Sequence, residues 1–112
     1  MYSEPGSYVT DFCIVRKSGI YHLFHIHGDM GGGWLGSRDF GHAISKNLYS
    51  WTPLDSVIPA GLSGSWDGNI VFAPHVVEKG GIYYMLYTGL DDDWNQKIGL
   101  ATSTDLFEWE KY

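Results

Sequence analysis

The fold is decided by the stretch Lys17-Ser18-Gly19-Ile20-Tyr21-His22-Leu23-Phe24, which recurs later in the chain as Lys79-Gly80-Gly81-Ile82-Tyr83-Tyr84-Met85-Leu86. A second pair follows: Gly41-His42-Ala43-Ile44-Ser45-Lys46-Asn47-Leu48-Tyr49-Ser50-Trp51 recurs as Gly99-Leu100-Ala101-Thr102-Ser103-Thr104-Asp105-Leu106-Phe107-Glu108-Trp109. Two matched stretches in the same order indicate an internal repeat, in which each copy is one structural unit.

Each copy is predicted to form four short strands. In the first copy we expect them at 11–16, 20–27, 39–45 and from Trp51 onward, and in the second at 69–78, 82–88, 97–103 and 109–112. The turn Lys17-Ser18-Gly19 joins two apolar-rich runs and is typical of a hairpin, because Gly accepts a positive φ. No window of helical length carries a 3.6-residue apolar period, so the chain is predicted to be all-β.

Four antiparallel strands repeated head to tail are typical of β-propeller blades. We therefore predict a single domain over residues 1–112, with a first blade at 8–58 and a second at 59–112. A blade covers the faces of its neighbours, so an isolated pair leaves an apolar face open on each side. We expect those faces to be covered either by homo-oligomerisation or by a missing portion of a longer chain. Two copies would give four blades, and three copies six.

Composition and charge exclude several classes of partner. Thirteen acidic and seven basic residues give a net charge of −6, which disfavours nucleic acid and an anionic membrane surface. The sequence shows neither an 18-residue apolar run nor a charged-then-apolar leader, so we expect no membrane span and no signal peptide. Cys13 is the single cysteine, which excludes an internal disulfide and makes the cytoplasm the default location.

The repeated residues also carry a family resemblance. Tyr21-His22-Leu23-Phe24 and the Gly41–Trp51 element resemble the first blade of glycoside hydrolase family 32, the invertase-like β-fructosidases. The segment Leu62-Ser63-Gly64-Ser65 is similar to that family's Phe-Ser-Gly-Ser, and Tyr87-Thr88-Gly89 to its Tyr-Thr-Gly. The segment Phe72-Ala73-Pro74-His75-Val76 looks more like the Ala-Pro-Asp-Ile element of family 43, the arabinanases and xylosidases.

The resemblance implies a five-bladed propeller whose central funnel holds three carboxylates from different blades. Asp11 falls where the family places its first-blade nucleophile or base, although the usual Asp-Pro is Asp11-Phe12 here. His75 occupies the second-blade carboxylate position of family 43, and Asp67 in the adjoining loop is a further candidate carboxylate. The general-acid Glu belongs to the third blade, so these two blades hold only part of a site that needs a pair of carboxyl groups.

Four further side chains are candidate sugar ligands: His25, Ser63, Trp66 and His75. His25 and His27 alternate onto one face of a strand, yet without a third ligand hydrogen-bonded histidines are favoured over a metal site. Trp34 and Trp66 lie in loops where an indole could stack on a sugar. The structural alternatives are a solvated acid for Asp11 and a buried, satisfied histidine for His75. Trp51 and Trp109, at equivalent repeat positions, are predicted to be core residues.

The sequence thus predicts a carbohydrate-active module related to glycoside hydrolases, with O-glycosyl hydrolysis by paired carboxylates as the chemistry and no cofactor. Because the acid is missing, whether the chain is an enzyme stays open. The alternative is a non-catalytic sugar-binding or self-assembling propeller protein.

Overall fold

The computed structural model describes residues 1–31 and 36–112, and it contains two four-stranded antiparallel sheets. The first sheet is formed by β1 (Ser7–Lys17), β2 (Ile20–Asp29), β3 (Phe40–Ser45) and β4 (Thr52–Val57). The second is formed by β5 (Ile70–Lys79), β6 (Ile82–Leu90), β7 (Gln96–Ser103) and β8 (Glu110–Lys111). In each sheet the strands pair in chain order. The predicted all-β fold with two propeller-type blades is confirmed.

The hairpin turns follow from local backbone chemistry. Ser18 and Gly19 have φ of 49° and 80°, and their counterparts Gly80 and Gly81 have φ of 62° and 81°. Two consecutive residues with positive φ match the right-handed twist of the strands on either side, which is why such turns close two-residue hairpins. The same turn therefore joins the first and second strands of both blades in the same register.

The second repeated motif is a structural turn between the third and fourth strands of each blade. The Oδ1 atoms of Asn47 and Asp105 each accept two backbone N–H bonds from residues that follow them, at 2.8 to 2.9 Å. The next residues, Leu48 and Leu106, have φ of 68° and 73°. Asn and Asp close such turns because their side chains replace backbone acceptors.

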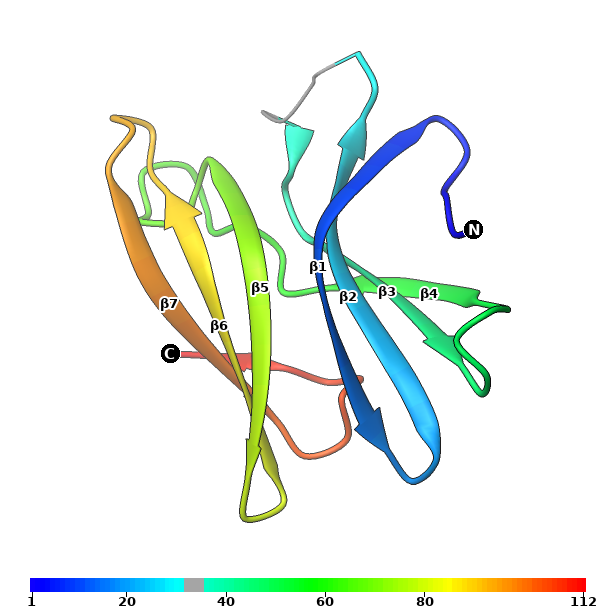
Figure 1. Ribbon diagram of the computed structural model, residues 1–112. Helices are drawn as coiled ribbons and strands as arrows, with labels where there is room; N and C mark the ends of the chain where they lie inside the picture. Colours follow the sequence, from blue (N-terminus) through cyan, green and yellow to red (C-terminus); the bar gives the residue numbers. More distant parts are fainter. Residues whose placement is uncertain (32–35) are drawn as a thin grey trace.

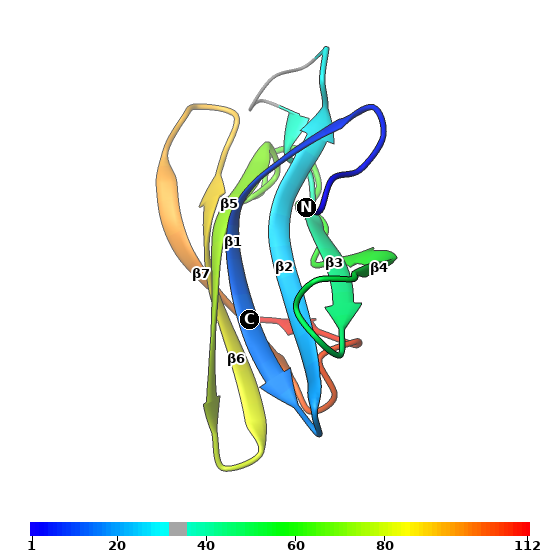
Figure 2. The same cartoon turned by 45° about the vertical axis from the view of Figure 1, so that its right-hand side comes forward.

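The two sheets pack face to face, with β1 and β5 side by side in the middle of the molecule (Figures 1 and 2). β4 lies at the opposite side of its sheet from β1 (Figure 1). This is the arrangement of neighbouring propeller blades, in which the first strands line the axis and the fourth strands lie at the rim. Among the described residues, no helix is long and apolar enough to cross a membrane.

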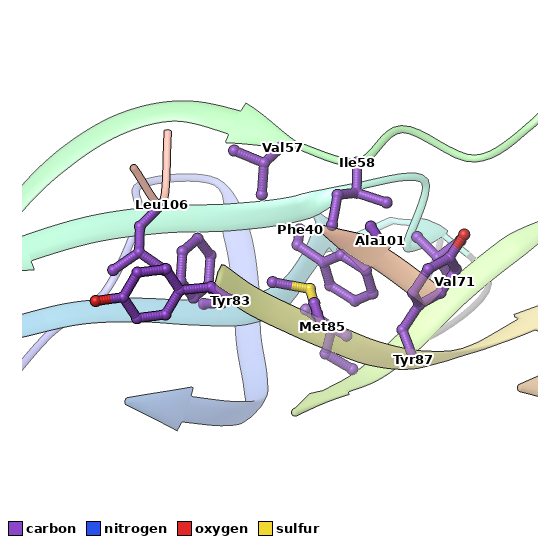
Figure 3. Close-up of a cluster of buried hydrophobic side chains, with 11 residues drawn as sticks. Phe40, Val57, Ile58, Val71, Tyr83, Met85, Tyr87, Ala101 and Leu106 are labelled. Atoms are coloured by element: carbon purple, nitrogen blue, oxygen red, sulfur yellow. The ribbon is translucent and has the colours of Figure 1, made fainter. Parts of the chain in front are cut away.

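The core lies between the two blades, where buried side chains from both sheets interdigitate (Figure 3). The first blade contributes Phe24, Ile26, Phe40, Val57 and Ile58, and the second contributes Val71, Tyr83, Met85, Tyr87, Ala101 and Leu106. Trp109 packs against this cluster as predicted, with its ring 5.5 Å from that of Phe24. Trp51 is only half-buried, because it lies on the far side of the first blade.

Candidate functional site

Asp11 lies at a β-bulge in the innermost strand of the first blade. Thr10 pairs with Ile26 and Phe12 with His25, so Asp11 is the extra residue, and its φ is 35°. Positive φ is uncommon for residues other than Gly, and such strain concentrates at functional sites. Bulges also redirect a side chain away from the regular ladder. The carboxylate of Asp11 is exposed at this bulge.

The second blade repeats the bulge without the acid. In β5 the register shifts between Phe72 and His75, and Ala73 has φ of 54°. When the two repeats are aligned, Asp11 therefore corresponds to Ala73, and Cys13 corresponds to His75. His75 is exposed and pairs with Leu86 of β6. Because Val76 packs on the core and side chains alternate along a strand, His75 points to the open face of the second blade.

A network of acids and histidines forms near the end of β2, the part of the strand that pairs with the first half of β1. The two ring nitrogens of His27 bond to carboxylates: Nδ1 to Glu4 Oε2 at 2.8 Å, and Nε2 to Asp39 Oδ1 at 2.5 Å. The hydroxyl of Ser56 donates to Asp39 Oδ2 at 2.8 Å. These bonds, the one to Asp39 foremost, raise the pKa of His27 to about 9 against the opposing effect of burial. His27 is therefore an imidazolium at neutral pH.

Both ring nitrogens of His27 are used in hydrogen bonds to carboxylates, those of Glu4 and Asp39. As an imidazolium, His27 donates both of these bonds. The pKa of Asp39 is held below its ordinary value, since the bonds from His27 and Ser56 outweigh the effect of burial. Within residues 1–31 and 36–112, no group of three or more His, Cys, Asp or Glu side chains is arranged to hold a metal ion.

His25 lies on the same face of β2 as His27, as predicted, with ring centroids 5.5 Å apart. The N-terminal segment covers it: the ring of Tyr2 lies edge-on at 5.4 Å, and Glu4 Oε1 is 3.3 Å from His25 Nε2. Gly41 lies beneath the ring, and a Cβ there would be 2.1 Å from the imidazole. The ring of His25 is fully buried, and its role in sugar binding stays a prediction.

Asp67 and Trp66 are built into the second blade. Asp67 is buried, accepts a hydrogen bond from the Tyr87 hydroxyl at 3.1 Å and forms an ion pair with Lys111 at 2.6 Å. Burial acts to raise the pKa of Asp67, but the bond and charge of Lys111 outweigh it and keep the pKa below its ordinary value. The indole of Trp66 stacks on Tyr87 at 5.8 Å and lies over Gly99. Both side chains thus have structural partners, and their sugar contacts stay predictions.

Ser63 is exposed in the turn that precedes the second blade. Its hydroxyl donates to Asp92 Oδ2 at 3.2 Å, and the N–H of Gly64 donates to the same oxygen at 3.1 Å. Asp91 in turn accepts backbone bonds from Asp93 and Asn95, so this acidic run forms a hydrogen-bonded loop. Trp34, the other candidate stacking residue, lies outside the described residues.

A cavity of 730 Å³ lies at the rim between the two blades. Its lining comes from Leu54–Pro59, from 107–111 and from His42, and it includes none of the residues predicted for the sugar site. The predicted carboxylate Asp11 and the cavity are therefore separate features of the molecule. We therefore place the candidate site at the bulge of Asp11 and not at the cavity.

Sequence reasoning missed two features: the Glu4–His27–Asp39 network and a buried pair of histidines between the blades. In that pair, His22 Nδ1 and His42 Nε2 are 2.9 Å apart. The alternation of His25 and His27 was the one available signal for the network. No pattern in the sequence links Glu4 or Asp39 to it, because the contacts depend on how distant segments pack.

Fold and site together define the class: two adjacent blades of a glycosidase-type propeller, with an acid at the first innermost bulge. The model of the glycosyl hydrolases family 32 N-terminal domain matches residues 12–112, directly after Asp11. The chain belongs to this family.

The relatives agree with this assignment. A cell-wall β-fructofuranosidase of Pisum sativum is 35% identical over 106 residues, which is 87% of this chain and 18% of that protein. A fructan 6-exohydrolase of Triticum aestivum is 35% identical over 67% of the chain and 12% of its own length. The chain thus spans less than a fifth of the length of these relatives.

Solved structures show the same fold. The fructan 1-exohydrolase IIa of Cichorium intybus superposes with a TM-score of 0.81 and 26% identity, over 99% of this chain and 22% of that one. A family 43 β-xylosidase/α-arabinofuranosidase from a compost metagenome gives a TM-score of 0.76 at 19% identity, over 94% of this chain and 34% of that one. The second likeness concerns the fold alone.

Proposed function

We propose that this chain is the part of a β-fructoside-binding site that supplies the first-blade carboxylate, Asp11. The observation that carries the proposal is the strained bulge: Asp11 has φ of 35° in the innermost strand and exposes its carboxylate there. A regular strand would not hold a residue at positive φ, so the surrounding pairing maintains this geometry. The names of the sequence relatives, a β-fructofuranosidase and a fructan exohydrolase, support a terminal fructofuranosyl unit as the ligand.

A single carboxylate limits the chemistry that these two blades can perform alone. Hydrolysis with retention requires two carboxyl groups about 5 Å apart, one as nucleophile and one as acid. The equivalent bulge of the second blade carries Ala73, so β5 supplies no second carboxylate at that position. Asp11 acts as nucleophile or base only where an acid from outside these two blades faces it. For the two blades alone, sugar binding is the function that the residues support.

The test is calorimetric titration with a short fructo-oligosaccharide, with a xylo-oligosaccharide as the competing ligand class. We expect binding of the fructoside alone, and a loss of at least about tenfold in affinity for Asp11→Asn, because hydrogen bonds to a charged group contribute about 1.5–3 kcal/mol. Asp55→Asn is the matched control, since Asp55 is an exposed acid on the rim strand β4. Binding of neither sugar, or equal affinities for Asp11→Asn and the chain, would overturn the proposal.

A non-catalytic sugar-binding protein is the second candidate, and Ala73 at the equivalent bulge favours it. Release of fructose from a fructan distinguishes the two. Turnover that disappears in Asp11→Asn supports a catalytic site completed by another carboxylate. Fructoside binding without release of fructose supports the non-catalytic protein.

A further inference from the structure

The first blade hydrogen-bonds to the innermost strand of the second. β5 is an edge strand of its sheet and lies beside β1 (Figures 1 and 2). Alternate residues of an edge strand direct their backbone N–H and C=O groups away from their own sheet. At Val71 both groups bond to Ser37: the N–H donates to the Ser37 carbonyl at 3.1 Å, and the C=O accepts from the Ser37 hydroxyl at 2.7 Å. We name these two hydrogen bonds the Ser37 bridge.

The Ser37 bridge is buried between the blades. Ser37 and Val71 are both 0% exposed. A buried carbonyl that loses its donor is costly, so the Val71 carbonyl depends on the Ser37 hydroxyl. The next residue, Arg38, adds a third bond, because its carbonyl accepts from the N–H of Ala60 at 2.6 Å. Ala60 lies in the connection from β4 to β5, so two adjacent residues of the first blade hold both this connection and the start of β5.

The Ser37 bridge lies close to both innermost bulges. β3 begins shortly after Ser37, and its first residue pairs with Ile26, the partner of Thr10 beside the first bulge. In β5, Val71 comes just before Ala73, the residue with positive φ in the second bulge. The bridge therefore joins the two blades at the end of the molecule where the bulges lie.

The bridge constrains β5 in a way that apolar packing does not. Near the bulges, the ring of Phe40 in the first blade meets that of Tyr87 in the second at 5.7 Å. Apolar contact is non-directional, so it holds two surfaces together without fixing how one slides along the other. β1 and β5 belong to different sheets, so no shared ladder sets their relative position. Hydrogen bonds have a narrow range of distance and angle, and the Ser37 bridge therefore sets the position of β5 along the first blade.

We propose that Ser37 is a positioning residue of the sugar site, which holds the bulge of Ala73 in a fixed place beside the bulge of Asp11. Ser37 does not contact the sugar, because its side chain is buried between the blades. It acts through the backbone of Val71 on the wall of the site that the second blade provides. The inference rests on the proposed sugar binding at Asp11, and every residue in it belongs to the interface between the two blades of this chain.

Loss of the Ser37 hydroxyl leaves the Val71 carbonyl without its donor. The start of β5 then moves until that carbonyl finds another partner, since a buried polar group without one is costly. A sugar bound at Asp11 faces a displaced second wall and binds more weakly. The strands away from this end keep their pairing, so the variant stays folded.

The test compares Ser37→Ala with Ser103→Ala. Ser103 is the matched control: it is 5% exposed, and its hydroxyl accepts the N–H of Leu106 at 2.8 Å in the turn after β7, far from the bulges. Both variants lose a buried hydroxyl, and urea unfolding measures the stability that each loses. In titrations with the fructo-oligosaccharide, Ser37→Ala is expected to bind about fivefold more weakly, the factor that one hydrogen bond contributes. Ser103→Ala is expected to bind like the chain.

Amide signals recorded without sugar separate positioning from a general loss of stability. Ser37→Ala is expected to shift the signals of residues 71–73 and to speed the hydrogen exchange of the Val71 amide. Ser103→Ala is expected to leave both unchanged. If Ser37→Ala does not fold, Ser37→Cys replaces it under reducing conditions, because a thiol is of similar size and only a weak donor.

The outcomes distinguish this inference from the proposed function. If the chain binds the fructoside and Ser37→Ala binds it equally well, the inference is overturned and the sugar site at Asp11 stands. Unchanged signals at residues 71–73, or an equal loss of affinity in Ser103→Ala, would overturn the inference in the same way. A chain that binds no fructoside would overturn the proposed function, and the positioning role of Ser37 with it.

Discussion

The buried pair His22–His42 is expected to make the two-blade unit lose stability in mild acid. His42 is 1% exposed, its ring stacks on Phe24 at 4.5 Å, and its Nε2 lies 2.9 Å from His22 Nδ1. Burial, with the nearby positive charge of a protonated His22, lowers the pKa of His42 from 6.5 to about 4. The two rings share one hydrogen bond only when at least one of them is neutral.

The magnitude follows from the two protonation equilibria. The unfolded chain takes up the His42 proton near pH 6.5, and the folded chain only near pH 4. The stabilisation is therefore present above pH 6.5 and is lost as the pH falls toward 4. Since one pKa unit corresponds to about 1.4 kcal/mol, the loss between pH 6.5 and pH 5.0 is about 1.5 kcal/mol.

The assay is urea unfolding at these two pH values for the chain, for His42→Gln and for His75→Gln. His27 does not change its contribution to stability between pH 6.5 and pH 5.0. Because its pKa is raised, the stability that it contributes is present below pH 6.5 and is lost as the pH rises through about 9. We expect His42→Gln to reduce the loss in stability on acidification by about 1.5 kcal/mol. The rest of the loss comes from His22 and His25, because burial lowers the pKa of both histidines as well. His75→Gln, at an exposed histidine, is expected to behave like the chain. Equal losses in His42→Gln and in the chain would refute the reasoning.

Two further predictions concern the second blade. Gly99→Ala is expected to lower the free energy of unfolding by about 1–3 kcal/mol, because its Cβ would lie 2.2 Å from the indole of Trp66. Gly31→Ala, whose Cβ would come no closer than 3.6 Å to any of the described residues, is the control in thermal unfolding, and equal shifts in both would contradict the packing of Trp66. Lys111→Met is expected to remove about 2 kcal/mol at pH 7, since it leaves the buried carboxylate of Asp67 without its cation. The depressed pKa of Asp67 makes this difference shrink as the pH falls below 3.8. Denaturant unfolding at pH 7 and pH 3 measures the stability lost in Lys111→Met, with Lys46→Met as the control. A loss in Lys111→Met that is the same at both pH values would exclude the ion pair as its cause.

The strands could be predicted because their signals are local. Ser18-Gly19 and Gly80-Gly81 encode the same hairpin turn, and Asn47 and Asp105 encode the same later turn. Strand pairing follows once both turns fix the register. β1 begins earlier than expected, at Ser7 instead of Asp11, because Ser7–Thr10 pair with the end of β2.

The site was harder to predict because bulges and distant contacts decide it. The bulge in β5 makes Ala73 the counterpart of Asp11, a register that sequence motifs around His75 do not reveal. Asp67 and Lys111 are far apart in the sequence and meet only when the turn before β5 packs against β8. Glu4 reaches His27 in the same way, through the folding of the N-terminal segment over β2.

The central claim is that the bulge at Asp11 faces the sugar, and amide chemical-shift mapping with a fructo-oligosaccharide tests it most directly. The shifted signals are expected to cluster at the two innermost bulges, at the amides of residues 10–12 and 72–73, and Asp11→Asn is expected to abolish them. Shifts confined to the rim cavity between β4 and residues 107–111, or no shifts at saturating sugar, would contradict it.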